Sequence, residues 1–232
     1  MAIAGCVSTL AYTPVPEAAV ARAQVVGYSH IRMWGDANVL EIDASTLFAF
    51  SSGSGGGKGA PSRNYLALPG GGGDGAYGAG LLVGWTARGG RPTFDVATGV
   101  SAGALAAPFV FLGPVYDTRL EEIYTRYKTD DLGTPQIFSA ALGGPSLVDA
   151  SGVEDFLAHY VNSELVDEIA REHARGRRLL VATTNVEAEH QVIWNLGAIA
   201  RPAPTRIASI CLGRCCSHQR PCPVWFRRSS SK

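Results

Sequence analysis

The sequence predicts an α/β fold with three layers, an α/β/α sandwich in which helices cover both faces of a mainly parallel sheet. Apolar runs typical of strands alternate along the chain with runs of helical period, and this alternation is typical of parallel sheets. Residues 178–184 (RLLVATT) contain a continuous apolar run, as expected of a strand that is buried on both faces. A chain of 232 residues, 46% of them hydrophobic, is long enough to bury the core of such a domain.

Four strands and five helices are expected in the body of the chain. Short β-prone runs that end at turn residues mark the strands, at residues 65–68, 94–98, 178–184 and 191–194. Apolar positions three or four residues apart mark the helices, at residues 76–86, 102–112, 117–127, 151–160 and 164–174. The last strand is expected to pair with the one before it, after a turn at residues 187–189.

Local signals fix the ends and the buried faces of these helices. The first helix stops before Gly89 and Gly90, and Ser151 and Glu154 form a capping box at the start of the fourth. The side chains expected to face the core are Leu120, Ile123, Tyr124 and Tyr127 in the third helix, and Val153, Phe156, Leu157 and Tyr160 in the fourth.

The composition divides the chain into three parts. Residues 1–63 form an N-terminal arm that ends in a flexible linker rich in glycine and serine (SSGSGGGKG). Residues 64–200 form the body, whose C-terminal part is expected to be incomplete, and residues 201–232 form a divergent, basic tail. The net charge of zero gives no indication of a nucleic-acid partner.

The arm is expected to combine helix and loop over residues 25–50, with Trp34, Ile42 and Phe48 as packing residues. At its start, Ile3-Ala4-Gly5-Cys6 resembles the lipobox of bacterial lipoproteins, in which the cysteine is lipidated. No charged and apolar signal region precedes that motif here. The prediction is therefore an envelope lipoprotein if the natural start lies further upstream, and a cytoplasmic protein otherwise.

The tail differs sharply from the body in composition. Residues 201–232 hold no acidic residue, seven basic residues and four of the five cysteines. This composition is typical of an out-of-frame or truncated end, because it shows no period that would bury a core. One alternative is a basic surface for anionic lipid. The other is a zinc site whose ligands would be Cys211, Cys215, Cys216, His218 and Cys222. Their spacing contains no paired Cys-x-x-Cys knuckle.

The most informative motif is a serine between two glycines at the junction of the second strand and its helix, Gly99-Val100-Ser101-Ala102-Gly103. This spacing is that of a nucleophile elbow, in which small neighbours let strand and helix approach around a strained serine. The turn sets the hydroxyl at the N-terminus of a helix, where developing negative charge is favoured. Ser101 is therefore the candidate nucleophile, against the alternative of an ordinary serine in a strand–helix turn.

A glycine-rich loop (GGGGDG, residues 70–75) follows the first strand and opens the first helix. Acyl transfer places negative charge on a carbonyl oxygen, and the backbone N–H groups of glycines can approach and stabilise that charge. Because the loop and the elbow follow neighbouring parallel strands, both are expected at the edge of the sheet where ligands bind. The candidate oxyanion hole consists of Gly70, Gly71, Gly72 and Gly73.

The same glycines fit the dinucleotide-binding pattern Gly-x-Gly-x-x-Gly, with Asp95 about twenty residues further on. In that fold the acidic residue stands at the end of the second strand, whereas Asp95 stands at its beginning. The second strand leads instead to Ser101. The placement of Asp95 therefore disfavours a nucleotide-binding site, and a titration with NAD or ATP would test that interpretation.

Together, the two motifs resemble those of the patatin-like phospholipases, over roughly residues 64–200. Members of that family carry a Gly-Gly-Gly loop that continues into Gly-Ala-aromatic, and then Gly-x-Ser-Ala-Gly-Ala-Leu; here these are GGGGDGAY and GVSAGAL. Asp74 stands where many members have arginine, which alters the charge beside the loop. The resemblance implies a lipid acyl hydrolase, of phospholipase A or esterase type, with an acyl-enzyme on Ser101. The motif glycines that match are Gly75, Gly99 and Gly103.

The resemblance also implies a Ser–Asp dyad that needs neither a metal nor a cofactor, acting on a lipid or acyl-ester substrate at a membrane surface. The family's aspartate stands in a downstream Asp-Gly-Gly or Asp-Gly-Ala motif. Here Asp-Gly-Ala occurs only at Asp74, no aspartate follows Asp167, and Asp149 lacks the glycine. The dyad aspartate is not found, so the chain is expected to be impaired in turnover.

Two alternatives remain for the function. A Ser-His-Asp esterase would need a histidine late in the sheet, for which His190 and His218 are the choices. A lipid-binding remnant would keep the fold without the chemistry. The remaining histidines, which belong to no shared motif, are expected on the surface or on a helix face: His30, His159 and His173.

Overall fold

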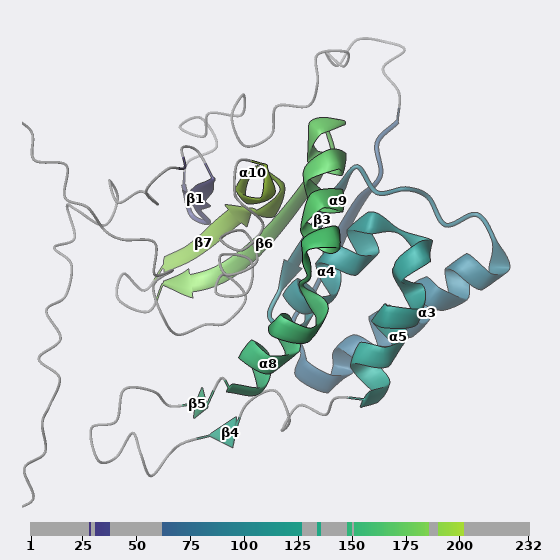
Figure 1. Cartoon of the computed structure of the whole chain (residues 1–232), viewed down its shortest axis with the longest axis horizontal. Coiled ribbons are helices and arrows are strands. Elements are labelled where there is room, and N and C mark those ends of the chain that lie inside the picture. Colours follow the sequence, from purple (N-terminus) through teal and green to yellow (C-terminus); the bar gives the residue numbers. More distant parts are fainter. Residues whose placement is uncertain are drawn as a thin grey trace, which may run out of the picture.

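The computed structural model describes residues 28, 31–37, 62–126, 134–135, 148–149, 151–185 and 190–201 (Figure 1). The predictions made for Cys6, His30, Ile42, Phe48, Tyr127 and the tail cysteines lie outside these residues. Within the described ranges, no helix is both long enough and apolar enough to pass through a bilayer.

Five strands form the main sheet, in the order β1-β7-β6-β3-β2. Their bounds are Arg32–Trp34 (β1), Tyr65–Leu68 (β2), Val96–Val100 (β3), Arg178–Asn185 (β6) and His190–Asn195 (β7). The strands β2, β3 and β6 are mutually parallel, β7 pairs with β6 antiparallel, and β1 pairs with β7 antiparallel. Four strands therefore point one way and β7 points the other, which confirms a mainly parallel sheet and the predicted pairing of the last two strands.

Each of the five predicted helices is present within one or two residues of its expected ends. Their bounds are Gly75–Arg88 (α3), Ala102–Leu112 (α4), Asp117–Arg126 (α5), Ser151–Tyr160 (α8) and Ser163–Ala174 (α9). The structure adds a short helix, α10 (Leu196–Ala200), two single turns, η1 (Gly72–Asp74) and η2 (Pro114–Tyr116), and a separate pair of two-residue strands, β4 (Thr134–Pro135) and β5 (Val148–Asp149).

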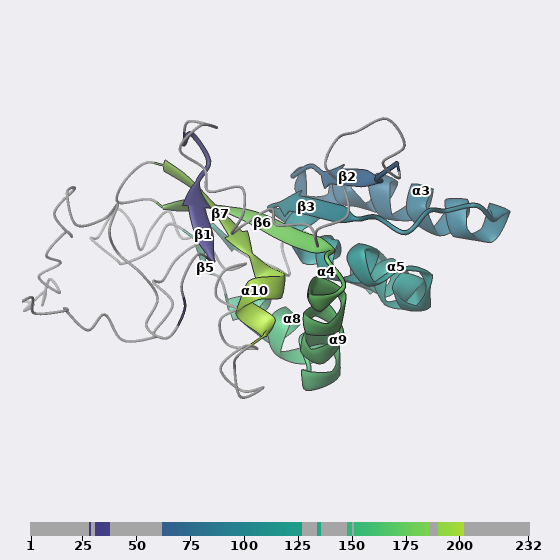
Figure 2. The ribbon, with the colours of Figure 1, turned by 90° about the horizontal axis from the view of Figure 1, so that it is seen from above.

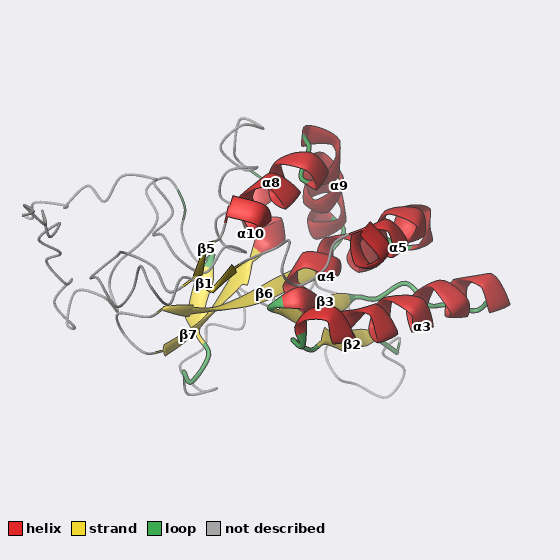
Figure 3. Ribbon diagram, turned by 90° about the horizontal axis from the view of Figure 1, so that it is seen from below, coloured by secondary structure: helices red, strands yellow, loops and turns green. Residues whose placement is uncertain are grey.

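Among the described residues, the helices α4, α8, α9 and α10 lie on one side of the sheet (Figure 2). Figure 2 shows α4, α8, α9 and α10 together below the strands, and Figure 3 gives the opposite view with the strands in yellow. The helix α3 lies at the β2 end of the sheet and packs against α5. The α/β sandwich is thus confirmed, and the described residues show its sheet and one of the two expected helical layers.

The core lies between the sheet and these helices. Ala97 of β3 pairs with Leu179 of β6, and both are fully buried in the cluster that includes Phe109 and Phe111 of α4. The side chains predicted to face the core are buried where the structure describes them, except Tyr124, which is partly buried: Leu120, Ile123, Phe156, Leu157 and Tyr160. Burying each large apolar side chain contributes about 1.5–3 kcal/mol, so the spacing that predicts these helices also accounts for their packing.

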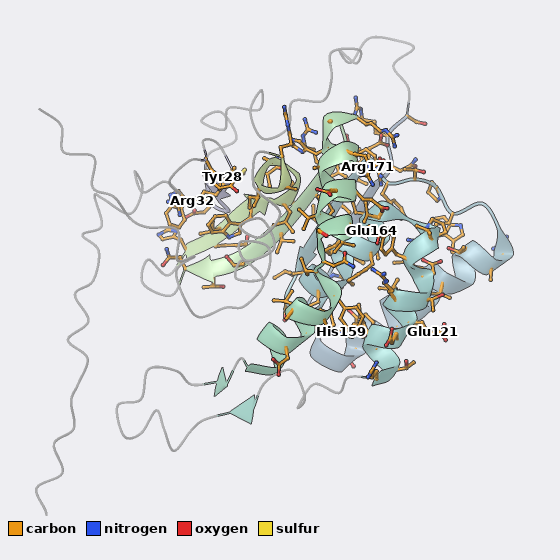
Figure 4. All side chains as sticks on the ribbon, viewed as in Figure 1. Tyr28, Arg32, Glu121, His159, Glu164 and Arg171 are labelled. Carbon is orange, nitrogen blue, oxygen red and sulfur yellow. The ribbon has the colours of Figure 1, made fainter. Side chains whose placement is uncertain are left out.

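The prediction of helix and loop for residues 25–50 is wrong at β1, which is a strand. Arg32 and Trp34 lie on one face of that strand, and the Arg32 guanidinium carbon lies 5.4 Å from the Trp34 ring centroid and 5.9 Å from that of Trp194. Figure 4 shows Arg32 and Tyr28 together at this end of the sheet. Three residues give too short a pattern to indicate a strand, because the pairing that makes β1 a strand comes from β7. The arm therefore contributes an edge strand to the body.

Candidate active site

Ser101 stands in a strained turn between β3 and α4. Its backbone has φ 53° and ψ −125°, and among the described residues it is the only non-glycine residue with a positive φ. A conformation of this kind costs on the order of 1–3 kcal/mol and persists only where packing enforces it. The side chain is exposed, and the helix that begins at the next residue is buried over most of its length.

Two glycines allow the close packing that enforces this turn. A Cβ on Gly99 would lie 2.3 Å from the carbonyl oxygen of Gly103, and a Cβ on Gly103 would lie 2.4 Å from the carbonyl oxygen of Leu68. Both distances are far below those of any real non-bonded contact between a Cβ and a carbonyl oxygen. The glycines therefore bring the first turn of α4 against both β3 and the end of β2.

The glycine loop reaches the same point from β2. A Cβ on Gly70 would lie 3.1 Å from the Cβ and 3.8 Å from the Oγ of Ser101. Gly71 and Gly72 have φ values of 140° and 55°, which favour glycine, and the Asp74 N–H donates to the Gly71 carbonyl at 3.0 Å. The structure thus brings the loop and the serine hydroxyl together at the carboxyl ends of β2 and β3.

Tyr124 of α5 joins the two motifs from behind. Its hydroxyl donates to the carbonyl oxygen of Ala102, the residue after the serine, at 3.1 Å. Its ring lies against Gly75, the residue after the loop, where a Cβ would meet the ring at 2.7 Å. Burial raises the pKa of Tyr124, so the hydroxyl remains a donor at ordinary pH. The sequence indicates that Tyr124 is a core residue and gives no signal for this contact.

Within the described part of the chain, the Ser101 hydroxyl has no hydrogen-bond partner. Asp117 pairs with the Arg91 guanidinium at 2.6 Å, and Asp95 accepts from the backbone N–H of Asn64 at 2.8 Å. Asp149 lies in β5, which belongs to the small second sheet. None of these carboxylates is positioned by a hydrogen bond to the serine.

The position of Asp95 also bears on the dinucleotide interpretation. It precedes β3, at the amino edge of the sheet, and its carboxylate fixes the segment that leads into β2. Ser101 and the glycine loop lie at the opposite, carboxyl edge. Asp95 is therefore on the wrong side of the sheet to bind a ribose beside that loop.

A histidine–carboxylate pair lies at the carboxyl edge, two strands away from β3. The Nδ1 atom of His190 lies 2.7 Å from Oδ2 of Asp36, and both side chains are about half exposed or more. His190 is the first residue of β7, opposite Asn185 at the end of β6. Asp36 and His190 stand 154 positions apart, so no sequence pattern could have paired them.

The other described histidines lie elsewhere. His159 is exposed on α8, and Figure 4 shows it at the α8 end that faces α5. His173 is buried at the end of α9, against Gly197 of α10. No group of three or more histidine, cysteine, aspartate or glutamate side chains in the described ranges is arranged to hold a metal ion.

The surroundings of the elbow are apolar. A narrow pocket opens between α4, α8, α9 and α10 and is lined almost wholly by carbon atoms. Ala104 and Leu105, one turn along α4 from Ser101, form part of its wall, with Phe156 of α8 and Leu165 of α9. Its free volume is only about 10 Å³, so it is a packing gap in the hydrophobic core and has no room for an acyl chain.

A family model described as patatin-like phospholipase matches residues 66–207, which is more than half of the 232 residues. The match includes the glycine loop, the elbow and every strand of the main sheet except β1 and the first residue of β2. No curated protein and no solved structure matches the chain.

Proposed function

Because the chain belongs to the patatin-like phospholipase family, whose members act on lipids, we propose that it is a lipid acyl hydrolase with Ser101 as nucleophile. The proposal is carried by one observation, the approach of the Gly70 backbone to the Ser101 side chain. A nucleophile and a set of amide donors must surround the same carbonyl group for acyl transfer to be catalysed.

The proposed reaction forms an acyl-enzyme. Oγ of Ser101 bonds to the ester carbonyl carbon, the carbonyl oxygen takes the negative charge, and the N–H groups of Gly70 to Gly73 stabilise it. The ester C–O bond then breaks, and the alcohol leaves with a proton. Water attacks the acyl-enzyme in the same way and releases the carboxylic acid. Losing one such donor typically costs about 3 kcal/mol of barrier.

Turnover is proposed to be slow because no described group is hydrogen-bonded to Ser101 to take its proton. The helix N-terminus and the amide donors support attack, but a serine hydroxyl without a base is a poor nucleophile. Removal of a catalytic base commonly lowers kcat by about 10⁴–10⁶.

The division into arm, body and tail at residues 63 and 200 is part of the same proposal, with β1 counted in the body's sheet.

The pair of His190 and Asp36 supports an alternative, Ser-His-Asp mechanism. Nδ1 of His190 contacts the Asp36 carboxylate, so Nε2 of His190 would take the proton of the Ser101 hydroxyl. From the registers of β3, β6 and β7, the Cα atoms of His190 and Ser101 lie roughly 12 Å apart, at about 4.8 Å per strand and 3.3 Å per residue. At this separation the proton cannot pass directly from Ser101 to His190, so the carboxyl edge of the sheet would have to close around the substrate first.

A fluorophosphonate probe and a p-nitrophenyl acyl ester test the proposal on the full chain. We expect slow labelling that reaches one label per chain, is lost in Ser101→Ala and is kept in Ser163→Ala, at an exposed serine at the start of α9. Ester turnover should fall at least about 10³-fold below the usual range of 1–10³ s⁻¹. His190→Ala should leave both readouts unchanged.

Each other outcome selects a rival. Loss of labelling in His190→Ala would establish the Ser-His-Asp mechanism. Absence of labelling in the unmodified chain would contradict a reactive Ser101 and favour the lipid-binding remnant. Ordinary turnover that survives His190→Ala would show that another group serves as the base and that the chain is not impaired.

A further inference from the structure

The helix α3 exposes an apolar face to solvent. Three large side chains spaced four residues apart stand on it: Tyr77 is 80% exposed, Leu81 59% and Trp85 40%. The other exposed positions of the helix before Arg88 are alanines and glycines: Ala76, Gly80, Gly84 and Ala87. A surface helix normally carries charged side chains opposite its buried face.

The opposite face of α3 already has its partner. Ala79 and Leu82 are buried in the core, and the helix packs along α5. From Gly75 to Ala87 the helix contains no charged residue at all. A helix that is apolar all round is one that is buried on every side in its working state, so the solvent face of α3 is shaped for contact with something other than water.

The position of this face indicates what covers it. The helix starts immediately after the glycine loop, and Tyr77 is only two residues beyond Gly75, which lies against Tyr124 behind the elbow. The exposed row therefore begins beside the proposed reaction centre. A substrate with long acyl chains is presented by a lipid–water interface, which is apolar below the head groups.

We propose that α3 docks the protein on a lipid surface, with Tyr77, Leu81 and Trp85 inserted at the level of the head groups and upper acyl chains. Tyrosine and tryptophan favour this level because each has an apolar ring and a polar atom. The inference rests on the proposed function, because the lipid substrate is the reason for choosing a lipid surface.

The size of the face disfavours a second copy of the chain as its partner. The three side chains expose on the order of 400 Å², given about 150–250 Å² for a whole aromatic side chain. A stable protein–protein interface needs about 800 Å² on each partner. An insertion into lipid needs no such area, since a few side chains suffice for reversible binding.

Sedimentation with phosphatidylcholine vesicles in high salt tests the docking. The neutral lipid and the salt suppress binding through the basic residues of the tail. The full chain carries Ser101→Ala so that no lipid is consumed. We expect Tyr77→Lys together with Leu81→Lys to lower the partition coefficient about 100-fold, roughly tenfold for each side chain.

Tyr65→Lys together with Val115→Lys is the matched control, because these apolar side chains are 63% and 82% exposed and lie outside α3. This control adds the same charge and should bind like the parent chain. Circular dichroism and the unfolding midpoint show whether both pairs of variants fold.

Trp85 supplies a second measurement that needs no charge-introducing variant. Lipids brominated in their acyl chains should quench tryptophan fluorescence in the parent chain, and Trp85→Phe should remove most of that quenching. Equal binding by the Tyr77/Leu81 variant and the control, or absence of quenching, would overturn the docking surface. So would a chain that forms a dimer through α3 and does not bind vesicles.

These results are separate from those on catalysis. A chain that binds vesicles through α3 but is not labelled at Ser101 would retain the docking surface and lose the proposed chemistry. A chain that is labelled but does not bind would do the reverse.

Discussion

Replacing Gly103 by alanine is expected to destabilise the protein, although alanine is the better helix former. At an open helix position, the change from glycine to alanine raises the free energy of unfolding by about 0.5–1 kcal/mol. Gly78 of α3 is such a position, because a Cβ there would meet nothing within 4 Å. Gly78→Ala is therefore the matched control for Gly103→Ala.

The expected loss at Gly103 follows from two contacts. Its Cβ would lie 2.4 Å from the carbonyl oxygen of Leu68 and 2.6 Å from that of Pro69. Reaching an ordinary separation would require the end of β2 to move by about 1 Å, and overpacking of this kind costs about 1–3 kcal/mol. We expect Gly103→Ala to lower the free energy of unfolding by about 2 kcal/mol. The same movement displaces Gly70 and should slow the labelling of Ser101.

Urea unfolding followed by tryptophan fluorescence measures the first effect, and the rate of fluorophosphonate labelling measures the second. The two variants should shift the midpoint in opposite directions, with Gly78→Ala labelled at the parent rate. If Gly103→Ala proved as stable as Gly78→Ala, α4 would not pack closely on the end of β2, and that packing would not hold Ser101 in its strained turn.

Burial lowers the pKa of His173 from 6.5 to about 4, so between these pH values the unfolded chain binds a proton that the folded chain does not. The free energy of unfolding should therefore fall by up to about 3 kcal/mol as the pH drops through that window. Measured at pH 7 and at pH 4.5, the free energy of unfolding should fall less in His173→Leu than in the parent chain. An equal fall in both would refute the assignment to His173. Tyr124→Phe keeps the ring but removes the hydrogen bond to Ala102, so it should cost about 1 kcal/mol and slow the labelling of Ser101. Tyr65→Phe, at an exposed tyrosine, is its control, and equal behaviour of the two variants would contradict a positioning role.

The elements of the body could be predicted from the sequence because each depends on residues close together in the chain. The helix α4 begins and ends where its alanine-rich run does, at Ala102 and Leu112. The strand β6 follows the apolar run that starts at residue 178. The glycines at 99 and 103 indicate a tight strand–helix turn by their spacing alone, since only a missing side chain permits that approach.

Tertiary structure alone decided the contacts that join distant segments. The strand β1 exists because β7 supplies its hydrogen bonds, about 160 positions away. The pairing of His190 with Asp36 and the contact of Tyr124 with Ala102 depend on how sheet and helices pack. Exposure is also a property of the whole fold: the sequence of α3 shows an apolar helix, but only packing decides that one apolar face remains in contact with water. Local pattern specifies which conformation a segment adopts, whereas the neighbours of each side chain follow from the long-range arrangement of all segments together.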